Sequence, residues 1–501
     1  MFYRHSTLGV AICALAIGVT ACAVGPNFKR PAPPAASDYG RAPIQGQTAE
    51  AEGTGGNAQH FVAGMDIPGQ WWTLFQSAQL NDLVQQSLKA NPDVGAAQAA
   101  LRQAHELYLA QKTSFFPLVQ GSFGGERSEF PTGTLTSPTV ASSSTYTLYT
   151  AQLTLTYTPD VFGLIRRQVE IAKAQEQSNR FQLEATYLTL SSNVVVTAIQ
   201  EASLRGQIAA TERLLQLGKQ LTDIVQRQRK LGTASELDLL AQQTAEAQTA
   251  QTLPPLQKQL GQSRDALTAL LGRLPSDEPQ ETFRLEDLTL PSELPVSVPS
   301  KLIEQRPDVR QAEENLHAAS AAVGVAIANM LPNFAIDADV GSSALTIGKL
   351  FTPYTGFWDA GASLTQTLFD AGALIHKHRA ADAALDQAGA QYRGAVILAC
   401  QNVADTLRAL QADADALKAS AEALRAAKAS FDLAEQQRAL GTISVVSMLN
   451  AEQAYRTAEL SLVQAQANRY ADTAGLFQAL GGGWWNRSEE PKYEQFSPPG
   501  R

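Results

Sequence analysis

The residues able to act as nucleophiles, acid–base catalysts or metal ligands form no catalytic pattern in this sequence. His105 and Glu106 begin like a zinc-metalloprotease motif, but no second histidine follows four residues later. His376 and His378 are two residues apart, so they point to different sides of a helix and make a poor metal pair. No Gly-x-Ser-x-Gly or nucleotide-binding glycine motif stands out. The sequence therefore predicts neither an enzyme nor a bound metal, and it offers no phosphate loop as an energy source.

Cys22 is the residue with the most specific chemistry. Arg4 precedes an apolar stretch, residues 8–21, that is too short to span a bilayer. The stretch ends in Val19-Thr20-Ala21 directly before Cys22, which resembles a bacterial lipoprotein signal. Residues 1–21 are then a signal peptide, and Cys22 carries a covalent lipid such as palmitate as the new N-terminus. The alternative is an ordinary signal peptide followed by a chance cysteine.

The other two cysteines offer no further chemistry. Cys13 leaves with the signal, and Cys400 is then alone in a helical stretch, so the mature chain has no disulfide. A buried, inert thiol is a better interpretation of Cys400 than a nucleophile. By resemblance to lipoproteins, Ala23 after the cysteine indicates the outer membrane. Beyond the lipid at Cys22 no cofactor is expected.

The amino-acid composition argues against several classes of protein. Charged residues make up 17% of the 501 residues, against about 25% in a typical soluble protein. The net charge of −9 and the lack of a basic stripe argue against nucleic acid as a partner. Beyond the signal no apolar run reaches about 18 residues, so no transmembrane helix is expected. A chain of this kind that crosses a bilayer does so with strands.

The chain contains two copies of a segment of about two hundred residues. Asn91-Pro92-Asp93-Val94 recurs as Arg306-Pro307-Asp308-Val309, at an offset of 215 residues. Leu231-Gly232-Thr233-Ala234-Ser235 recurs as Leu440-Gly441-Thr442-Ile443-Ser444, at an offset of 209. Two fused copies predict a pseudo-symmetric fold. Each copy opens with a helix whose small or apolar residues repeat every 3.5 positions, a coiled-coil pattern.

Each opening helix ends at a second proline, Pro117 or Pro332, and the pattern then changes to period two. Leu153, Leu155 and their neighbours alternate with threonines, and Asp337 and Asp339 alternate with apolar residues. Four strands are therefore predicted, at about 117–128, 146–159, 332–342 and 356–369. Strands of about ten residues with one apolar face are typical of membrane barrels, although the signal of each strand is weak.

Very long helices follow the strand pairs. Residues 163–230 and 372–439 contain no proline, which corresponds to about 100 Å of continuous helix in each copy. Gly232 and Gly441 are suited to end these helices, and Ser235 and Ser444 to begin returning ones. After the signal peptide, the chain is predicted to consist of a tether, two repeats joined by a linker, and a tail. Their bounds are 22–60 for the tether, 61–274 for the first repeat with its return helix at 235–271, 275–300 for the linker, 301–481 for the second repeat with its return helix at 444–480, and 482–501 for the tail.

Seven short motifs in order make the sequence similar to the TolC/OprM/NodT family of outer-membrane factors. They include Trp71-Trp72-Thr73-Leu74-Phe75, the two Pro-Asp-Val helix starts, Asp160-Val161-Phe162-Gly163, Leu368-Phe369-Asp370-Ala371-Gly372 and the two Leu-Gly-Thr turns. The resemblance implies an α+β membrane protein that assembles as a homotrimer. Strand counting agrees: four strands cannot close a barrel, whereas three chains supply twelve. By resemblance, helices continue this 12-stranded barrel as a periplasmic tunnel.

The resemblance also implies a function and a site. The trimer is expected to be a passive exit duct, in the outer membrane of a Gram-negative bacterium, for drugs or small toxic compounds. By resemblance, an inner-membrane pump of the RND type delivers them through a periplasmic adaptor. The family docks its adaptor and closes its iris at the far ends of the long helices. Those ends hold Arg229, Leu231, Gly232, Thr233 and Ser235 in the first copy and Arg438, Leu440, Gly441, Thr442 and Ser444 in the second.

Other interpretations remain open from the residues alone. The two turns also fit simple helix hairpins without a partner. Asp432 and Glu435 are candidate gate residues that attract cations, or they are solvated surface charges. A lipid-anchored periplasmic coiled-coil scaffold explains the helices and Cys22, although not the alternating segments. A type I protein secretion duct is a further alternative within the channel class.

Overall fold

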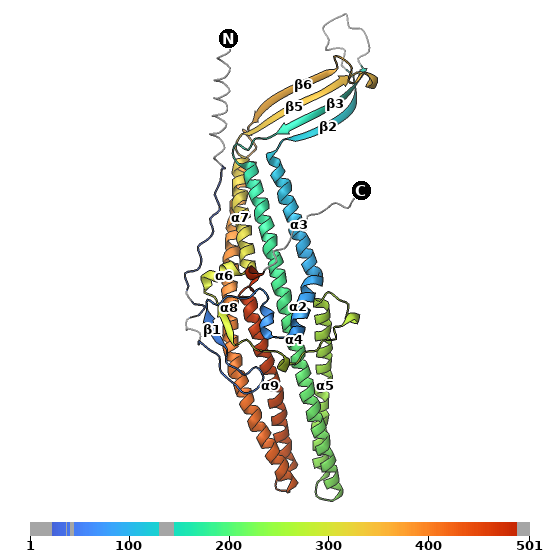
Figure 1. The fold of residues 1–501 in the computed structure, drawn as a ribbon, viewed down its shortest axis with the longest axis vertical. Helices are drawn as coiled ribbons and strands as arrows, with labels where there is room; N and C mark the ends of the chain where they lie inside the picture. Colours follow the sequence, from blue (N-terminus) through green and yellow to red (C-terminus); the bar gives the residue numbers. More distant parts are fainter. Residues whose placement is uncertain (1–22, 37, 41–44, 130–144, 488–501) are drawn as a thin grey trace, which may run out of the picture. The chain divides into compact units, whose positions relative to one another are not determined.

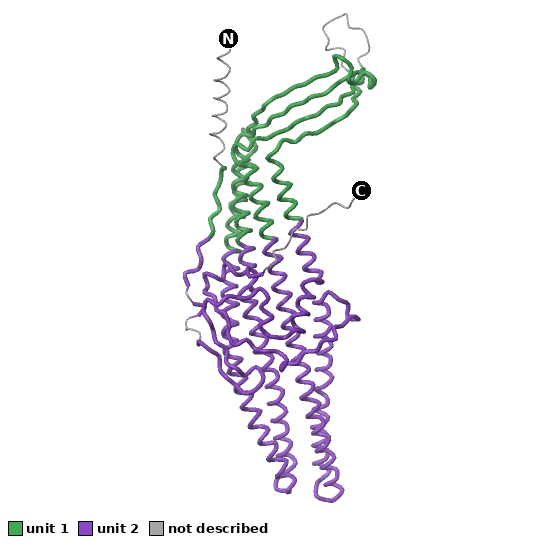
Figure 2. Tube along the Cα trace, viewed as in Figure 1, with its two compact units in different colours: residues 1–30, 103–178, 313–391 green, residues 31–102, 179–312, 392–501 purple. Residues whose placement is uncertain are grey.

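The computed structural model describes residues 23–36, 38–40, 45–129 and 145–487 (Figure 1). The signal peptide and Cys22 lie outside these residues. The chain divides into two compact units, one formed by residues 1–30, 103–178 and 313–391, the other by the remainder (Figure 2). Each unit takes corresponding segments from both copies of the repeat.

The first unit holds a four-stranded antiparallel sheet. Its strands are β2 (Leu118–Glu129), β3 (Thr145–Tyr157), β5 (Asn333–Ala344) and β6 (Gly356–Thr365), paired in the order β2-β3-β5-β6. The strand β6 ends four residues earlier than the alternation suggests. Thr365 pairs with Asn333, the first residue of β5, so the following residues have no partner on that strand.

Aspartates cap the long helices where each strand pair ends. Asp160 accepts hydrogen bonds from the backbone N–H groups of Ile165 and Arg166 at the start of α4 (Leu164–Lys230), at 2.9 and 3.0 Å. Asp370 accepts from Gly372 and Leu374 at the start of α8 (Ala373–Ala439), at 2.9 and 2.7 Å. These carboxylates satisfy backbone donors that no helical carbonyl reaches, and their charge suits a helix N-terminus.

The opening helices of the two copies are α3 (Pro92–Lys112) and α7 (Pro307–Ala328). Both begin at the proline that the sequence predicts, where a missing N–H is harmless. Val94 and Leu101 of the first copy are buried, as are their counterparts Val309 and Leu316 in the second. The 3.5-residue pattern therefore marks the packed side of both helices.

The second unit is built around two helix hairpins. The lower part of α4 returns as α5 (Glu236–Leu270), and the lower part of α8 returns as α9 (Val445–Ala479) (Figure 1). The helix α5 continues through Pro254 and Pro255. Each proline removes one intrahelical hydrogen bond and disfavours a helix. Packing against neighbouring helices must therefore stabilise this stretch.

Regular structure begins at the end of the segment predicted as a tether, residues 22–60. The strand β1 (His60–Ala63) pairs in parallel with β4 (Glu293–Val296), which lies in the proline-rich linker between the copies. Just before it, Thr48 and Gln59 are buried and receive hydrogen bonds from the buried Arg469 of α9. The part of the tether from Thr48 onward is thus packed against the second unit.

The remaining short helices of this unit are α2 (Ala78–Ala90) and α6 (Pro299–Gln305). Aromatic residues form much of the core near them: Trp71 stacks on Phe477 at 5.4 Å, and Phe75 and Tyr470 lie against each other. Among the described residues, none of the helices has the length and apolar character needed to cross a bilayer.

Candidate functional site

The two Leu-Gly-Thr turns are nearly identical helix endings. Gly232 has φ +73° and Gly441 has φ +74°, a left-handed conformation that glycine adopts without strain. In each turn the threonine N–H and hydroxyl both donate to one carbonyl of the preceding helix, Gln228 in the first and Gln437 in the second, at 2.9–3.0 Å. This is the Schellman ending of a helix, and it satisfies carbonyls that would otherwise lack donors.

The returning helices begin at the predicted serines. Ser235 accepts a hydrogen bond from the N–H of Asp238 at 3.1 Å, and the Asp238 carboxylate accepts one from the N–H of Ser235 at 2.9 Å, a full capping box. Ser444 accepts from Ser447 at 3.1 Å, but serine at that position supplies no carboxylate. The hydrogen bonds from Ser235 lower the pKa of Asp238.

The arginines that precede the turns have different partners although they are equivalent in sequence. Arg229 forms an ion pair with Glu236 of its own hairpin. Arg438 instead donates from Nη2 to the Oε1 atom of Gln228, on the other hairpin, at 3.1 Å, and from Nη1 to its own turn. Arg438 therefore links the two hairpin tips within one chain, whereas Arg229 does not.

All ten residues predicted for the tip lie at these two turns, and the tips present apolar side chains to solvent. Leu231 is 79% exposed and Leu440 is 78% exposed. Leu237 and Val446, in the first turns of the returning helices, are exposed as well. Leu231 and Leu237 give the first tip a small exposed apolar surface, and Leu440 and Val446 give one to the second tip.

The two predicted gate residues lie apart from the contact that joins the tips. Asp432 forms an ion pair with Lys428, one turn earlier on α8, at 3.1 Å. Glu435 is exposed on the same helix. The residue that sequence reasoning missed is Gln228, the partner of Arg438. A neutral glutamine inside a long polar helix carries no signal that could have distinguished it.

Above the tips, the hairpins pack together through an apolar cluster. Leu221 of α4, Phe431 of α8 and Met448 of α9 are buried in it. Further contacts between the hairpins are polar: Arg213 with Glu459 at 2.7 Å, Gln207 with Gln464 at 3.2 Å, and Arg456 with the Ala245 carbonyl at 3.3 Å. Separating the hairpins requires breaking these contacts and exposing the cluster to water.

A buried carboxylate interrupts this interface. Glu452 of α9 is 1% exposed, and neither of its oxygens has a well-placed hydrogen-bond partner among the described residues. Gln242 of α5 faces it, and Arg456 lies one turn away on α9. Burial raises the pKa of Glu452 because it disfavours the ionised form.

We expect Glu452→Gln to stabilise the protein at pH 8 and to change its stability little at pH 4. The pKa of Glu452 is higher in the folded protein than in the unfolded chain. The protonated carboxyl therefore makes its full contribution to stability at low pH, below the pKa of the unfolded chain. This contribution is lost as pH rises through the folded-state pKa. Glutamine mimics the neutral form, and the gain at pH 8 should be about 1–3 kcal/mol in unfolding free energy. Thermal unfolding at both pH values measures it.

The matched control for this prediction is Glu422→Gln, at an exposed position of α8. It should leave the unfolding midpoint unchanged at both pH values. An equal gain from Glu452→Gln at pH 4 and at pH 8 would show that the ionisation of Glu452 is not the cause.

The two tips differ from the rest of the helices in their exposed apolar side chains and in the contact between them. Among the described residues, no three His, Cys, Asp or Glu side chains are placed to hold a metal ion. What the tips offer instead is two exposed turns and one cross-hairpin hydrogen bond.

Known proteins of the same architecture are close enough to define a family. The model of the outer membrane efflux protein family matches residues 83–273 and 298–482. The pyoverdine export outer membrane protein OpmQ of Pseudomonas putida is 28% identical over 422 residues, which cover 83% of this chain and 89% of OpmQ. The probable efflux pump outer membrane protein TtgC of the same species is 27% identical over 487 residues, 96% of each chain.

A solved structure agrees with these sequence relatives. The outer-membrane channel OprN superposes with a TM-score of 0.82 at 26% identity, covering 92% of this chain and 100% of OprN. The long helices and the sheet described above are therefore those of a TolC-family channel. The chain belongs to the outer membrane efflux protein family, and it is an efflux channel of the Gram-negative outer membrane.

Proposed function

We propose that three copies of this chain form a 12-stranded barrel that continues as a helical periplasmic tunnel. The observation that supports the trimer is the sheet itself. Within the described residues, β2 and β6 each pair on one side only, which leaves a row of backbone donors and acceptors at both edges. Each unpaired group costs several kcal/mol in lipid, so the edges need partner strands from other copies.

The two faces of the sheet differ in the way that a water-filled pore requires. One row across the four strands is Gly121, Leu153, Val340 and Trp358, and its three large side chains are exposed in the single chain. The next row is Gln120, Thr154, Asp339 and Asp359. In a closed barrel the apolar rows face lipid and the polar rows face the lumen.

The proposed activity is passive conduction rather than catalysis. Small compounds, drugs among them, enter from an inner-membrane pump of the RND type through a periplasmic adaptor, and they leave through the lumen. Relatives named for pyoverdine export and for an efflux pump support this role over protein secretion. In this proposal the two hairpin tips dock the adaptor, Arg438 and Gln228 hold the tips closed, and a lipid at Cys22 anchors the chain.

Disulfide cross-links between edge strands test the trimer. In a Cys400→Ser background, one cysteine is placed on β2 between positions 119 and 123 and one on β6 between 358 and 363. The cross-linked chain should run as a trimer on a denaturing gel and return to monomer on reduction. Repeating the experiment over several pairs covers the unknown register between copies.

A pair within one chain serves as the control. Gln120→Cys and Thr154→Cys face each other on β2 and β3, so they should cross-link without changing the apparent size. Cross-linking that stops at dimers for every edge pair would contradict the trimer.

A further inference from the structure

The first described residues form a strap, residues 23–30, that follows the helices of the first unit. The Val24 N–H donates to the Phe162 carbonyl in the turn between β3 and α4, at 3.0 Å. Gly25 has φ +88°, and a Cβ atom added there would stand 2.4 Å from the Cα atom of Gly324 on α7. The strap thus contacts the backbone of α7 directly, which only a pair of glycines permits.

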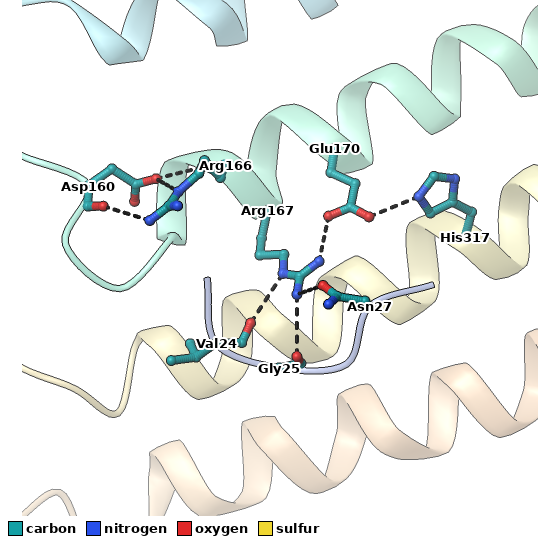
Figure 3. A network of polar contacts seen from close by, with 8 residues as sticks. All are labelled: Val24, Gly25, Asn27, Asp160, Arg166, Arg167, Glu170 and His317. Carbon is teal, nitrogen blue, oxygen red and sulfur yellow. Dashed lines mark hydrogen bonds and ion pairs between the residues drawn. The ribbon is translucent and has the colours of Figure 1, made fainter. Parts of the chain in front are cut away.

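Arg167 of α4 holds the strap by three hydrogen bonds, as Figure 3 shows. Its guanidinium donates to the Val24 carbonyl at 3.1 Å, to the Gly25 carbonyl at 3.3 Å and to the Asn27 side chain at 2.8 Å. Arg167 is buried, and Glu170 neutralises its charge at 2.7 Å. A buried guanidinium that directs most of its N–H groups at one short peptide forms a specific binding site for that peptide.

Two more contacts extend the attachment towards Arg30. The Phe28 ring stacks on the His317 ring with centroids 4.4 Å apart, and His317 is held by Glu170 at 2.9 Å and Glu314 at 3.4 Å. Arg30 pairs with the buried Glu313 at 3.0 Å. The strap is therefore fixed at Val24, Asn27, Phe28 and Arg30, along its whole length.

The strap begins where the sheet meets the helices, and large apolar side chains are exposed at the junctions there. Phe116 and Leu118 precede and begin β2, and Leu118 pairs with Thr156 near the end of β3. Leu368 and Phe369, between β6 and α8, are about 90% exposed. Exposed apolar residues of this kind at one end of a membrane sheet are suited to contact with the bilayer.

We propose that Arg167, Gly324 and His317 form a cradle that fixes the depth at which the N-terminus meets the bilayer. Residues 23–30 dock in this cradle, and Ala23 lies against Gly163 at the end of the turn between β3 and α4. A lipid on the preceding residue would therefore start from a fixed point of the first unit. The protein, and not the length of a loose tether, then sets the position of the anchor. The claim about the position of the anchor rests on the proposed lipidation at Cys22, whereas the docking of the strap does not.

Hydrogen–deuterium exchange of the full-length protein in lipid nanodiscs tests the docking. Arg167→Ala should speed exchange of the Val24 amide at least about tenfold, because that amide is protected only while the strap is docked. The matched control is Arg205→Ala, an arginine further along α4 that pairs with Glu201 at 2.8 Å. Equal effects of the two substitutions, or no effect of either, would overturn the proposal.

A glycine pair gives a second test if Arg167→Ala does not fold. A Cβ atom on Gly324 would stand 2.9–3.0 Å from the Arg167 side chain and displace it, whereas one on Gly389 of α8 meets only Leu316 at an ordinary 3.9 Å. Gly324→Ala should therefore speed exchange of Val24, and Gly389→Ala should not. The opposite order would also overturn the proposal.

The depth of the anchor is tested by a nitroxide at the exposed position 26, in a Pro26→Cys, Cys400→Ser protein. Its accessibility to lipid-dissolved oxygen is compared in four proteins: the parent, Arg167→Ala, Cys22→Ala exported by another signal peptide, and both together. The proposal expects Arg167→Ala to change the accessibility and Cys22→Ala to leave it unchanged. If the accessibility follows Cys22 instead, the lipid sets the depth and the proposal is wrong. Neither measurement depends on transport, so a failure of the proposed channel function would not be mistaken for a failure of the cradle.

Discussion

Tryptophan at both turn glycines, Gly232→Trp with Gly441→Trp, is expected to abolish efflux while the trimer still forms. A Cβ atom added at either glycine meets no described atom within 4 Å, so a larger side chain can leave the turn towards open space. The left-handed backbone costs about 1–2 kcal/mol per turn, which a protein with this many packed helices should tolerate. What the bulk destroys is the surface on which a partner would dock. Drug susceptibility of a strain that relies on this channel, with native gels for the trimer, measures both outcomes.

Two companion variants separate docking from strain. Gly232→Ala with Gly441→Ala imposes the same backbone strain without the bulk, so it should retain most of the efflux. Gly261→Trp places the same bulk on an exposed position of α5 that is equally open among the described residues. Wild-type susceptibility in the double tryptophan variant would show that the tips are ordinary hairpin turns.

The second large effect is expected from Arg438→Ala, which should raise the open probability of the channel in planar bilayers. The substitution removes the hydrogen bond to Gln228 that joins the tips. A hydrogen bond to a charged group contributes about 1.5–3 kcal/mol, and exposure to water at the tips argues for the lower end. A change of about 1.4 kcal/mol shifts the closed-to-open ratio roughly tenfold.

Arg229→Ala is the natural control because Arg229 pairs within its own hairpin. It should leave the conductance near that of the parent. Gln228→Ala should reproduce the effect of Arg438→Ala, and the double substitution should add little to either, as expected for two partners of one contact. Equal conductance of the two arginine variants would refute the role of Arg438.

Much of the fold was predictable because it depends on local patterns that the repeat shows twice. Prolines mark the helix starts, the change from period 3.5 to period 2 marks the strands, and Gly232 and Gly441 mark the turns. The misjudged parts lack such patterns. The strand β1 has four residues, and its partner β4 lies more than two hundred residues away in a segment rich in proline. Pairing of that kind depends on tertiary packing, which overrides weak local preference.

The location of the candidate site in the chain was predictable, but the contacts between its side chains were not. The turns were located from Leu-Gly-Thr, but the different roles of Arg229 and Arg438 depend on which side chain comes near each. Two of the four partners of Arg167 among the described residues are backbone carbonyls, which any sequence would supply. Neither distinction is encoded in residue type or spacing.

The open edges of the four-stranded sheet also constrain how the protein is made. Within the described residues, β2 and β6 of a single chain each present a row of unpaired backbone groups, which lipid does not tolerate. If the proposed trimer closes the barrel, insertion and oligomerisation are one event. Its rate should rise steeply with the concentration of subunits in the periplasm. Until that event, the edges of each new subunit are open to pairing with other strands, so subunits made in excess are expected to aggregate or to be degraded rather than to persist as a reserve.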